Sequence, residues 1–219
     1  IGGPAKKNKL ISIKEKNMIA YHESGHAILG LKLQHAQVVQ KVTIIPRGQA
    51  GGYVLMTPEQ DQFLETKGEL LDEICGLLGG RICEEVFFDD ITTGAHNDIE
   101  KATRIARLMV TEFGMSNLGP IQYEKNSGSV FLGRDYTNSQ RSFSSEVGKE
   151  IDREVRRIID ECYAKAKEIQ MVFPWRKTFA KLVLDSGKLP RYNHFGEIST
   201  GFFIAVTEKR RIYAIYKKV

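Results

Sequence analysis

The 219-residue sequence predicts a mainly α-helical fold with a small β-sheet. Four segments favour helices. Apolar residues recur at helical spacing within 64–88 and 144–171, residues 95–113 lie between helix start and stop signals, and residues 13–33 begin after a helix-start signal. The stretch 38–46 is instead rich in β-branched residues and ends at a proline, which is typical of a strand. The chain is long enough for one large or two small domains with a real core.

The helix ends carry local signals. Ser12 is followed three residues later by Glu15, the capping-box pattern of a helix start. The 95–113 segment follows small polar residues and stops at Gly114.

Glycines interrupt two of these helices. Gly25 and Gly30 lie in 13–33, and Gly79 and Gly80 lie in 64–88. Glycine weakens a helix interior, so Gly25 and Gly30 predict close approach by another backbone, and Gly79 and Gly80 predict tight packing.

Shorter elements complete the prediction. A turn over 47–52 leads to a second strand at 53–56, and 115–141 is rich in loop residues. Residues 174–187 favour one short helix, and 201–218 favour two short strands around a charged turn.

The composition indicates a globular domain, with 42% hydrophobic and 27% charged residues. No apolar run approaches the roughly 18 residues of a membrane span, and no signal-peptide pattern is present. We therefore expect any membrane attachment to lie outside this segment. Cys75, Cys83 and Cys162 form no C-x-x-C pair, which favours reduced thiols in a cytosolic-type compartment. Cys75 and Cys83 are expected in the core, not on a metal.

The formal charge of +5 is unevenly distributed. Residues 174–219 hold ten Lys or Arg and three Asp or Glu, whereas residues 1–173 hold 22 basic and 24 acidic residues. A nucleic-acid site needs a basic stripe on a folded face. The nearly neutral segment 1–173 shows no such stripe, so we expect no nucleic-acid partner.

Residues 21–26, YHESGH, contain the pattern H-E-x-x-H. On a helix, His22 and His26 lie on one face about one turn apart, where two ring nitrogens can reach one metal ion. Glu23 is rotated by about 100° from His22 and can stand beside the metal as a general base. The alternative is a solvated polar face with no metal.

A catalytic zinc site needs a third protein ligand and an open position. Asp98 lies in the first turn of a predicted helix, where the helix dipole favours an acid, although it can also be a helix-start residue with no other role. Glu84 and Glu85 can orient the histidines from a second layer or form an exposed acidic pair. The remaining candidates are His96, expected at the surface, and the more distant His35 and His194.

Six motifs occur in one order: HESGHA, VTIIPRG, LLGGRICEEVFF, TTGAHNDIEKAT, GMSNLGP and VFLGRD. Together they resemble the peptidase domain of the FtsH family of membrane-anchored AAA+ ATP-dependent zinc metalloproteases, over about residues 5 to 170. The resemblance implies a zincin-like peptidase domain. It implies that His22, His26 and Asp98 bind one zinc ion, that Glu23 is the catalytic base, and that Glu84 belongs to the second layer.

The resemblance also implies features that this segment does not contain. Family members are membrane-anchored hexamers in which an upstream ATPase feeds unfolded or membrane-extracted proteins to the peptidase. No phosphate-binding G-x-x-x-x-G-K-[ST] pattern occurs here, so ATP is expected to bind outside this segment. The location implied is the cytoplasmic side of a bacterial inner membrane, or the matrix or stromal side in a eukaryote.

Three regions are therefore expected: a linker at 1–10, the zinc metallopeptidase domain at 11–170, and a divergent basic tail at 171–219. The tail does not resemble the usual family ending. A divergent lineage, a frameshifted or vector-derived tail and a genuine added element all remain open.

The expected activity is zinc metalloendopeptidase hydrolysis, in which Glu23 takes a proton from a metal-polarised water. Zinc suits imidazole and carboxylate ligands, although iron and cobalt also accept them. The segment around 42–56 can offer a strand edge to an extended substrate or be plain core sheet. An inactive scaffold subunit of the same fold is the main alternative, and a stand-alone zinc peptidase is the second.

Overall fold

The computed structural model describes residues 11–46, 51–58, 63–124, 143–173, 180–181 and 183, and the backbone of 202–207 and 211–216. The helices are α1 (Ile13–Lys32), α2 (Lys67–Phe88), the short 3-10 turn η1 (Thr93–Ala95), α3 (His96–Thr111) and α4 (Ser145–Val172). The strands are β1 (Val38–Thr43), β2 (Tyr53–Thr57), β3 (Phe202–Thr207) and β4 (Arg211–Tyr216). The predicted mainly α-helical fold with a small sheet is confirmed.

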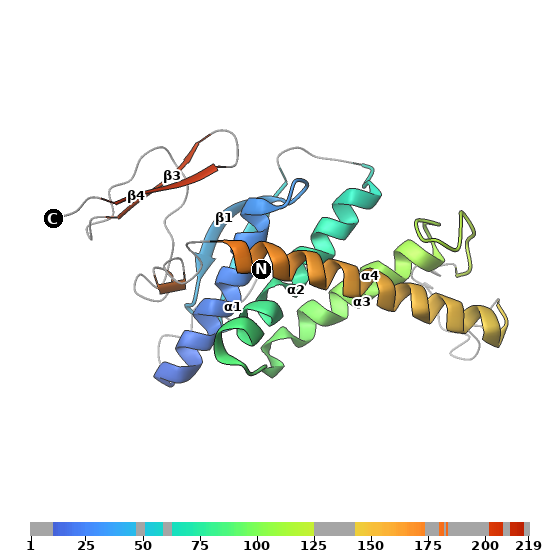
Figure 1. Cartoon of the computed structure of the whole chain (residues 1–219), viewed down its shortest axis with the longest axis horizontal. Helices are drawn as coiled ribbons and strands as arrows, with labels where there is room; N and C mark the ends of the chain where they lie inside the picture. Colours follow the sequence, from blue (N-terminus) through green and yellow to red (C-terminus); the bar gives the residue numbers. More distant parts are fainter. Residues whose placement is uncertain are drawn as a thin grey trace, which may run out of the picture.

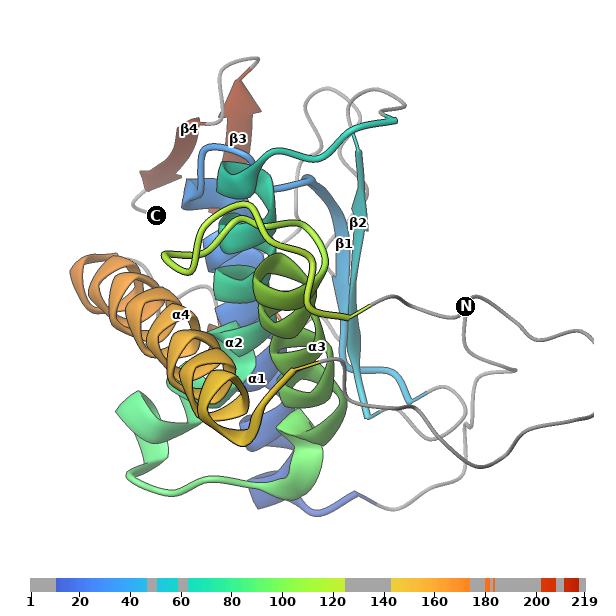
Figure 2. The ribbon, with the colours of Figure 1, turned by 90° about the vertical axis from the view of Figure 1, so that its right-hand side faces the viewer.

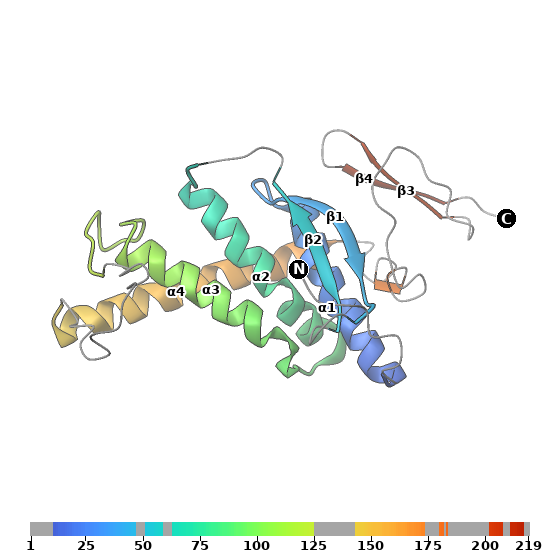
Figure 3. The same ribbon diagram turned by 180° about the vertical axis from the view of Figure 1, so that it is seen from behind.

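The helices and the first hairpin form three layers. Figure 1 shows α4 crossing in front of the other helices, and Figure 3, from behind, shows β1 and β2 in front of α1. Figure 2 shows the order of the layers, with α4 first, α1 to α3 in the middle and the hairpin last. Helix α1 contacts α2, α4, β1 and β2, so it is enclosed from several sides.

Side-chain caps fix the starts of three helices. The Ser12 hydroxyl accepts the Glu15 N–H at 3.1 Å, as the sequence predicts. Thr66 and Glu69 form a complete capping box at the start of α2, with N···O distances of 2.6 and 3.3 Å. Ser144 caps α4.

Strands β1 and β2 pair antiparallel, with Val38 opposite Thr57 and Thr43 opposite Tyr53. The pairing shifts between Val39 and Lys41, where one extra residue makes a bulge. β1 ends three residues earlier than the predicted strand because the Thr43 hydroxyl accepts the Ile45 N–H and turns the chain before Pro46.

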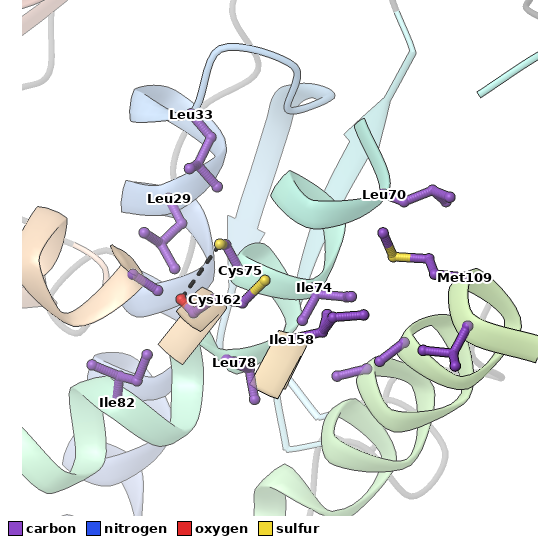
Figure 4. Packing of buried hydrophobic residues seen from close by; sticks show 14 of the residues in the cluster. Leu29, Leu33, Leu70, Ile74, Cys75, Leu78, Ile82, Met109, Ile158 and Cys162 are labelled. Carbon is purple, nitrogen blue, oxygen red and sulfur yellow. Dashed lines mark hydrogen bonds between the residues drawn. The ribbon is translucent and has the colours of Figure 1, made fainter. Parts of the chain in front are cut away.

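The main core lies among all four long helices (Figure 4). Ile74, Ile82, Met109 and Ile158 are almost fully buried within it. All three cysteines are buried free thiols, which confirms the expectation for Cys75 and Cys83.

A second core lies between α1 and the first hairpin. It contains Ala27, Ile28, Val39 and Val42. Because α1 faces both cores, nearly its whole circumference is buried from Ala20 to Gly30. A helix buried all round holds its polar residues in a dry environment, which raises the energetic cost of leaving them unpaired.

Helices α1 and α2 cross at Gly25, where the sequence predicts a close backbone, and at Gly79, where it predicts tight packing. A Cβ atom at Gly25 would lie 2.3 Å from the Gly79 carbonyl oxygen, and one at Gly79 would lie 2.8 Å from the Gly25 carbonyl oxygen. Gly30 differs from expectation, because its neighbours are the Val39 and Met56 side chains and not another backbone.

The C-terminal segment is described only in part. Strands β3 and β4 pair antiparallel, with Phe202 opposite Tyr216, which confirms the two predicted strands. Of the helix predicted over 174–187, residues 180, 181 and 183 are described and helical. The linker predicted at 1–10 lies outside the described residues. Within the described part of the chain, no helix has the length and apolarity needed to cross a bilayer.

The glycine crossing gives a prediction for stability. Gly25→Ala should lower the free energy of unfolding by about 3 kcal/mol, because its methyl group would overlap a backbone oxygen of α2. Gly76→Ala is the matched control: nothing lies within 4 Å of its added Cβ, so we expect a gain of about 0.5–1 kcal/mol. Urea unfolding of both variants measures the difference. Equal stabilities would contradict the close crossing.

Candidate metal centre

Three ligand-type side chains meet at the junction of α1 and α3. The His22 and His26 Nε2 atoms are 3.1 Å apart, and Asp98 Oδ2 is 3.4 Å from each. Ligands placed at the zinc distance of about 2.0–2.1 Å form a tetrahedron whose edges are about 3.3–3.4 Å. The three observed separations are close to these edges, so the residues fit a tetrahedral zinc ion with one open position.

Hydrogen bonds from α2 orient both rings. His26 Nδ1 lies 2.8 Å from the Gly76 carbonyl oxygen, and His22 Nδ1 lies 2.8 Å from Glu84 Oε1. A carbonyl oxygen and a carboxylate can only accept, so Nδ1 donates in both histidines. In the neutral rings, the unprotonated Nε2 atoms therefore point toward each other and toward Asp98, as a metal ligand set requires.

Glu84 also connects the histidines to the segment that carries Asp98. Its two carboxylate oxygens accept the backbone N–H and the hydroxyl of Thr92, at 2.8 and 2.9 Å. Arg81 donates to the Thr92 carbonyl oxygen at 2.9 Å. Thr92 immediately precedes η1, which leads into α3, so these bonds fix where α3 begins and where Asp98 lies.

Burial and close charges shift the pKa values of this cluster. Burial lowers the pKa of His22, but hydrogen bonds to Asp98 and Glu84 and the nearby Glu23 charge outweigh it and raise that pKa to about 9. Burial raises the pKa values of Asp98 and Glu84, but hydrogen bonds outweigh it and lower both. Asp98 accepts these hydrogen bonds from His22 and His26, and Glu84 accepts them from His22 and Thr92. The cluster thus stabilises a positive charge at its centre.

Glu23 lies beside the ligands without joining them. It is 7% exposed, and the three-residue ligand group contains only His22, His26 and Asp98 among the described residues. Burial raises the pKa of Glu23, although both histidines oppose this shift. Gly52 packs against it, since a Cβ atom there would lie 2.8 Å from Glu23 Oε1. A buried carboxylate with a raised pKa is suited to accept a proton.

The other sequence candidates lie elsewhere. Glu85, the second candidate for supporting the histidines, lies on another side of α2, where its carboxylate accepts hydrogen bonds from Lys167 and Tyr163 on α4. Glu84 and Glu85 are adjacent on a helix, so they face different directions. His96 and His35 are exposed and do not join the ligand group, and His194 is outside the described residues.

Several contacts of the site were not predicted from the sequence. The Gly76 carbonyl oxygen orients His26, Gly80 leaves room for the His22 ring, and Thr92 holds Glu84. A Cβ atom at Gly80 would lie only 2.4 Å from His22 Cε1. The sequence predicts close packing at Gly80, but it does not predict that the His22 ring is the group packed there. Thr92 had a weaker signal, as one of the small polar residues before a helix.

The family model described as Peptidase family M41 matches residues 9–201, which is most of the chain. The chain belongs to peptidase family M41. The M41 match continues to residue 201, whereas the resemblance in the sequence was expected to end near 170.

Similar proteins agree with the M41 assignment. The chain is 58% identical over 171 residues to a Bacillus subtilis protein named ATP-dependent zinc metalloprotease FtsH. The aligned region covers 77% of this chain and 27% of that protein. A protein of the same name from Acholeplasma laidlawii is 59% identical over 167 residues, covering 76% and 26%. One from Aster yellows witches'-broom phytoplasma is 48% identical over 200 residues, covering 91% and 28%. The chain thus spans about a quarter of the length of these relatives.

The position of Asp98 predicts its effect on metal binding. Asp98→Ala should lose most of the bound zinc, because it removes the only carboxylate in the three-residue group. Elemental analysis after gel filtration measures zinc per chain. Full zinc retention would contradict a ligand role for Asp98.

Glu84 and Glu85 form a matched pair for testing the support of His22. Glu84→Gln should weaken zinc binding by about 10–100-fold, since such supporting partners tune ligand basicity and orientation. Glu85→Gln should bind zinc as the wild type does. Competition with a chelator measures both affinities, and equal effects of the two changes would refute the assignment.

Proposed function

We propose that this chain is the peptidase part of an ATP-dependent zinc metalloendopeptidase that cleaves unfolded or membrane-extracted proteins. This proposal rests on the meeting of His22, His26 and Asp98, whose ligand atoms lie 3.1–3.4 Å from one another. The buried carboxylate of Glu23 lies beside them. The relatives named as zinc metalloproteases support the same reaction class.

His22, His26 and Asp98 would hold the zinc ion. When bound, zinc would supply Lewis-acid chemistry, polarising the scissile carbonyl and lowering the pKa of water. Glu23 takes the proton from the attacking water and delivers it to the leaving amine nitrogen. Its burial favours this exchange, because a raised pKa brings the carboxylate nearer to the pH at which it works.

The β1–β2 hairpin supports binding of an extended substrate. Among the described strands, β1 and β2 pair only with each other. Gly52 precedes β2 and contacts Glu23, so a peptide added along the β2 edge would pass close to the general base. Main-chain pairing of this kind gives affinity with little sequence preference, which suits an enzyme for unfolded chains.

The remaining features are proposed on the family resemblance. They are a homo-hexamer, an AAA+ module that binds ATP and delivers substrate, and a membrane anchor outside this segment. The peptidase would lie on the cytoplasmic side, or on the matrix or stromal side in an organelle. We propose no nucleic-acid partner. No observation favours the inactive scaffold, since all four groups of the reaction are present together.

Replacing the general base separates catalysis from metal binding. Glu23→Gln should reduce cleavage of unfolded casein by at least about 100-fold, because the amide cannot accept the proton from water. Its zinc content should remain that of the wild type, since Glu23 is not in the ligand group. Casein requires no unfolding, so the assay does not depend on ATP. Glu85→Gln is the control, and equal cleavage by the Glu23→Gln and wild-type chains would refute the proposal.

A further inference from the structure

Helix α2 sets the orientation of both histidines on α1. His26 Nδ1 is bound by the Gly76 carbonyl oxygen and His22 Nδ1 by Glu84, each at 2.8 Å. These two contacts are eight residues apart along α2. Any shift of α1 along or across α2 would therefore move both Nε2 atoms relative to Asp98, which lies on a third helix.

The point where the two helices touch lies between these two contacts. Gly25 stands between His22 and His26, and Gly79 stands between Gly76 and Glu84. Each glycine faces the other's carbonyl oxygen. The Cys83 side chain packs beside Gly25 and the Leu29 side chain packs beside Gly79. The glycines themselves have no side chains to interlock, so they permit close approach but do not by themselves fix the register of the two helices.

A side chain from α4 reaches this crossing. Gln170 is 1% exposed, and its Nε2 lies 2.9 Å from the Gly79 carbonyl oxygen and 3.4 Å from the Gly25 carbonyl oxygen. An amide group has two N–H donors, and a helical carbonyl oxygen keeps a second lone pair after its own helix bond. One amide can therefore bridge the two helices, and Figure 1 shows the last turns of α4 lying over α1 and α2.

Packing alone is a poor explanation for this residue. A buried amide loses its hydration, and Gln170 Oε1 has no hydrogen-bond partner among the described residues. An apolar side chain of the same length would fill the space without that cost. The polar group must therefore serve the specific geometry of the crossing.

We propose that Gln170 is a positioning residue for the metal centre, and that its amide fixes the register of α1 on α2 at the glycine crossing. This inference rests on the proposed binding of zinc by His22, His26 and Asp98. Among the described residues, the hydrogen bonds of Gln170 go to the Gly25 and Gly79 carbonyl oxygens and to none of the three ligands. It acts through the backbone of the two helices that hold the histidines and their supports.

Gln170→Met tests this role because methionine has the same length but no N–H donors. We expect zinc affinity to fall about tenfold, as found for other supporting contacts. The visible absorption bands of the cobalt-loaded chain should shift. The melting temperature of the zinc-free chain should be retained or raised, because a buried amide with an unpaired oxygen has been removed. Chelator competition, cobalt spectroscopy and thermal melting of the purified chain measure these three quantities.

Two control variants are needed. One removes an amide outside the crossing, and the other lowers stability without removing an amide. Gln40→Met removes another amide, whose Nε2 bonds Thr57 on the hairpin, and should bind zinc as the wild type does. Ile158→Val removes a buried methyl group of α4 and should lower the melting temperature without changing zinc affinity. A tenfold loss of affinity in Ile158→Val would overturn the inference, since stability alone would then explain the effect.

The outcomes distinguish this inference from the proposed function. If the wild type binds zinc and Gln170→Met binds it equally well, the positioning role is refuted while the metal centre stands. If the wild type binds no zinc, both are refuted. If Gln170→Met does not fold, Gln170→Asn takes its place: its shorter amide cannot span both carbonyl oxygens, and unchanged affinity there would also overturn the inference.

Discussion

The contact of α1 with α2 at Gly25 and Gly79 is the constraint on which the site depends. It brings the two backbones close enough for α2 to hold both imidazoles, one through Glu84 and one through a backbone carbonyl oxygen. It also requires space at Gly80 for the His22 ring. The same contact closes the main core, since Leu29 and Leu78 pack within it. Fold and site therefore share one packing requirement.

The site concentrates charge where the fold is dry. His22, Glu23 and Glu84 are buried, and Asp98 is only partly exposed. Buried carboxylates and imidazoles are costly unless each is hydrogen-bonded or bound to a metal. Glu84 meets this requirement with three hydrogen bonds. The facing Nε2 atoms of His22 and His26 lie 3.1 Å apart and each is 3.4 Å from Asp98 Oδ2, a spacing that suits a shared metal ion. Such a local departure from ordinary packing is expected at a functional site.

The sequence predicted the parts of the site that follow from one helix. The spacing of His22 and His26 follows from 3.6 residues per turn, and Asp98 is in the first turn of α3 as predicted. Spacing alone could not choose between Glu84 and Glu85, because the rotation of α2 about its axis depends on what packs against it, whereas the family resemblance pointed to Glu84. Gly76 and Gln170 act through backbone contacts between distant segments, so no local pattern identifies them. The fold was predicted well for the same reason that the distant contacts were not: caps and periodicity are local properties.

The measurement that tests the account most directly is zinc X-ray absorption on the metal-loaded chain. The account predicts a four-coordinate ion with two imidazole nitrogens and one carboxylate oxygen at about 2.0–2.2 Å. It also predicts that replacing either His22 or His26 removes one imidazole from the spectrum. A zinc shell without imidazole scattering, or one unchanged by those replacements, would contradict the central claim that α1, held by α2, carries the metal site.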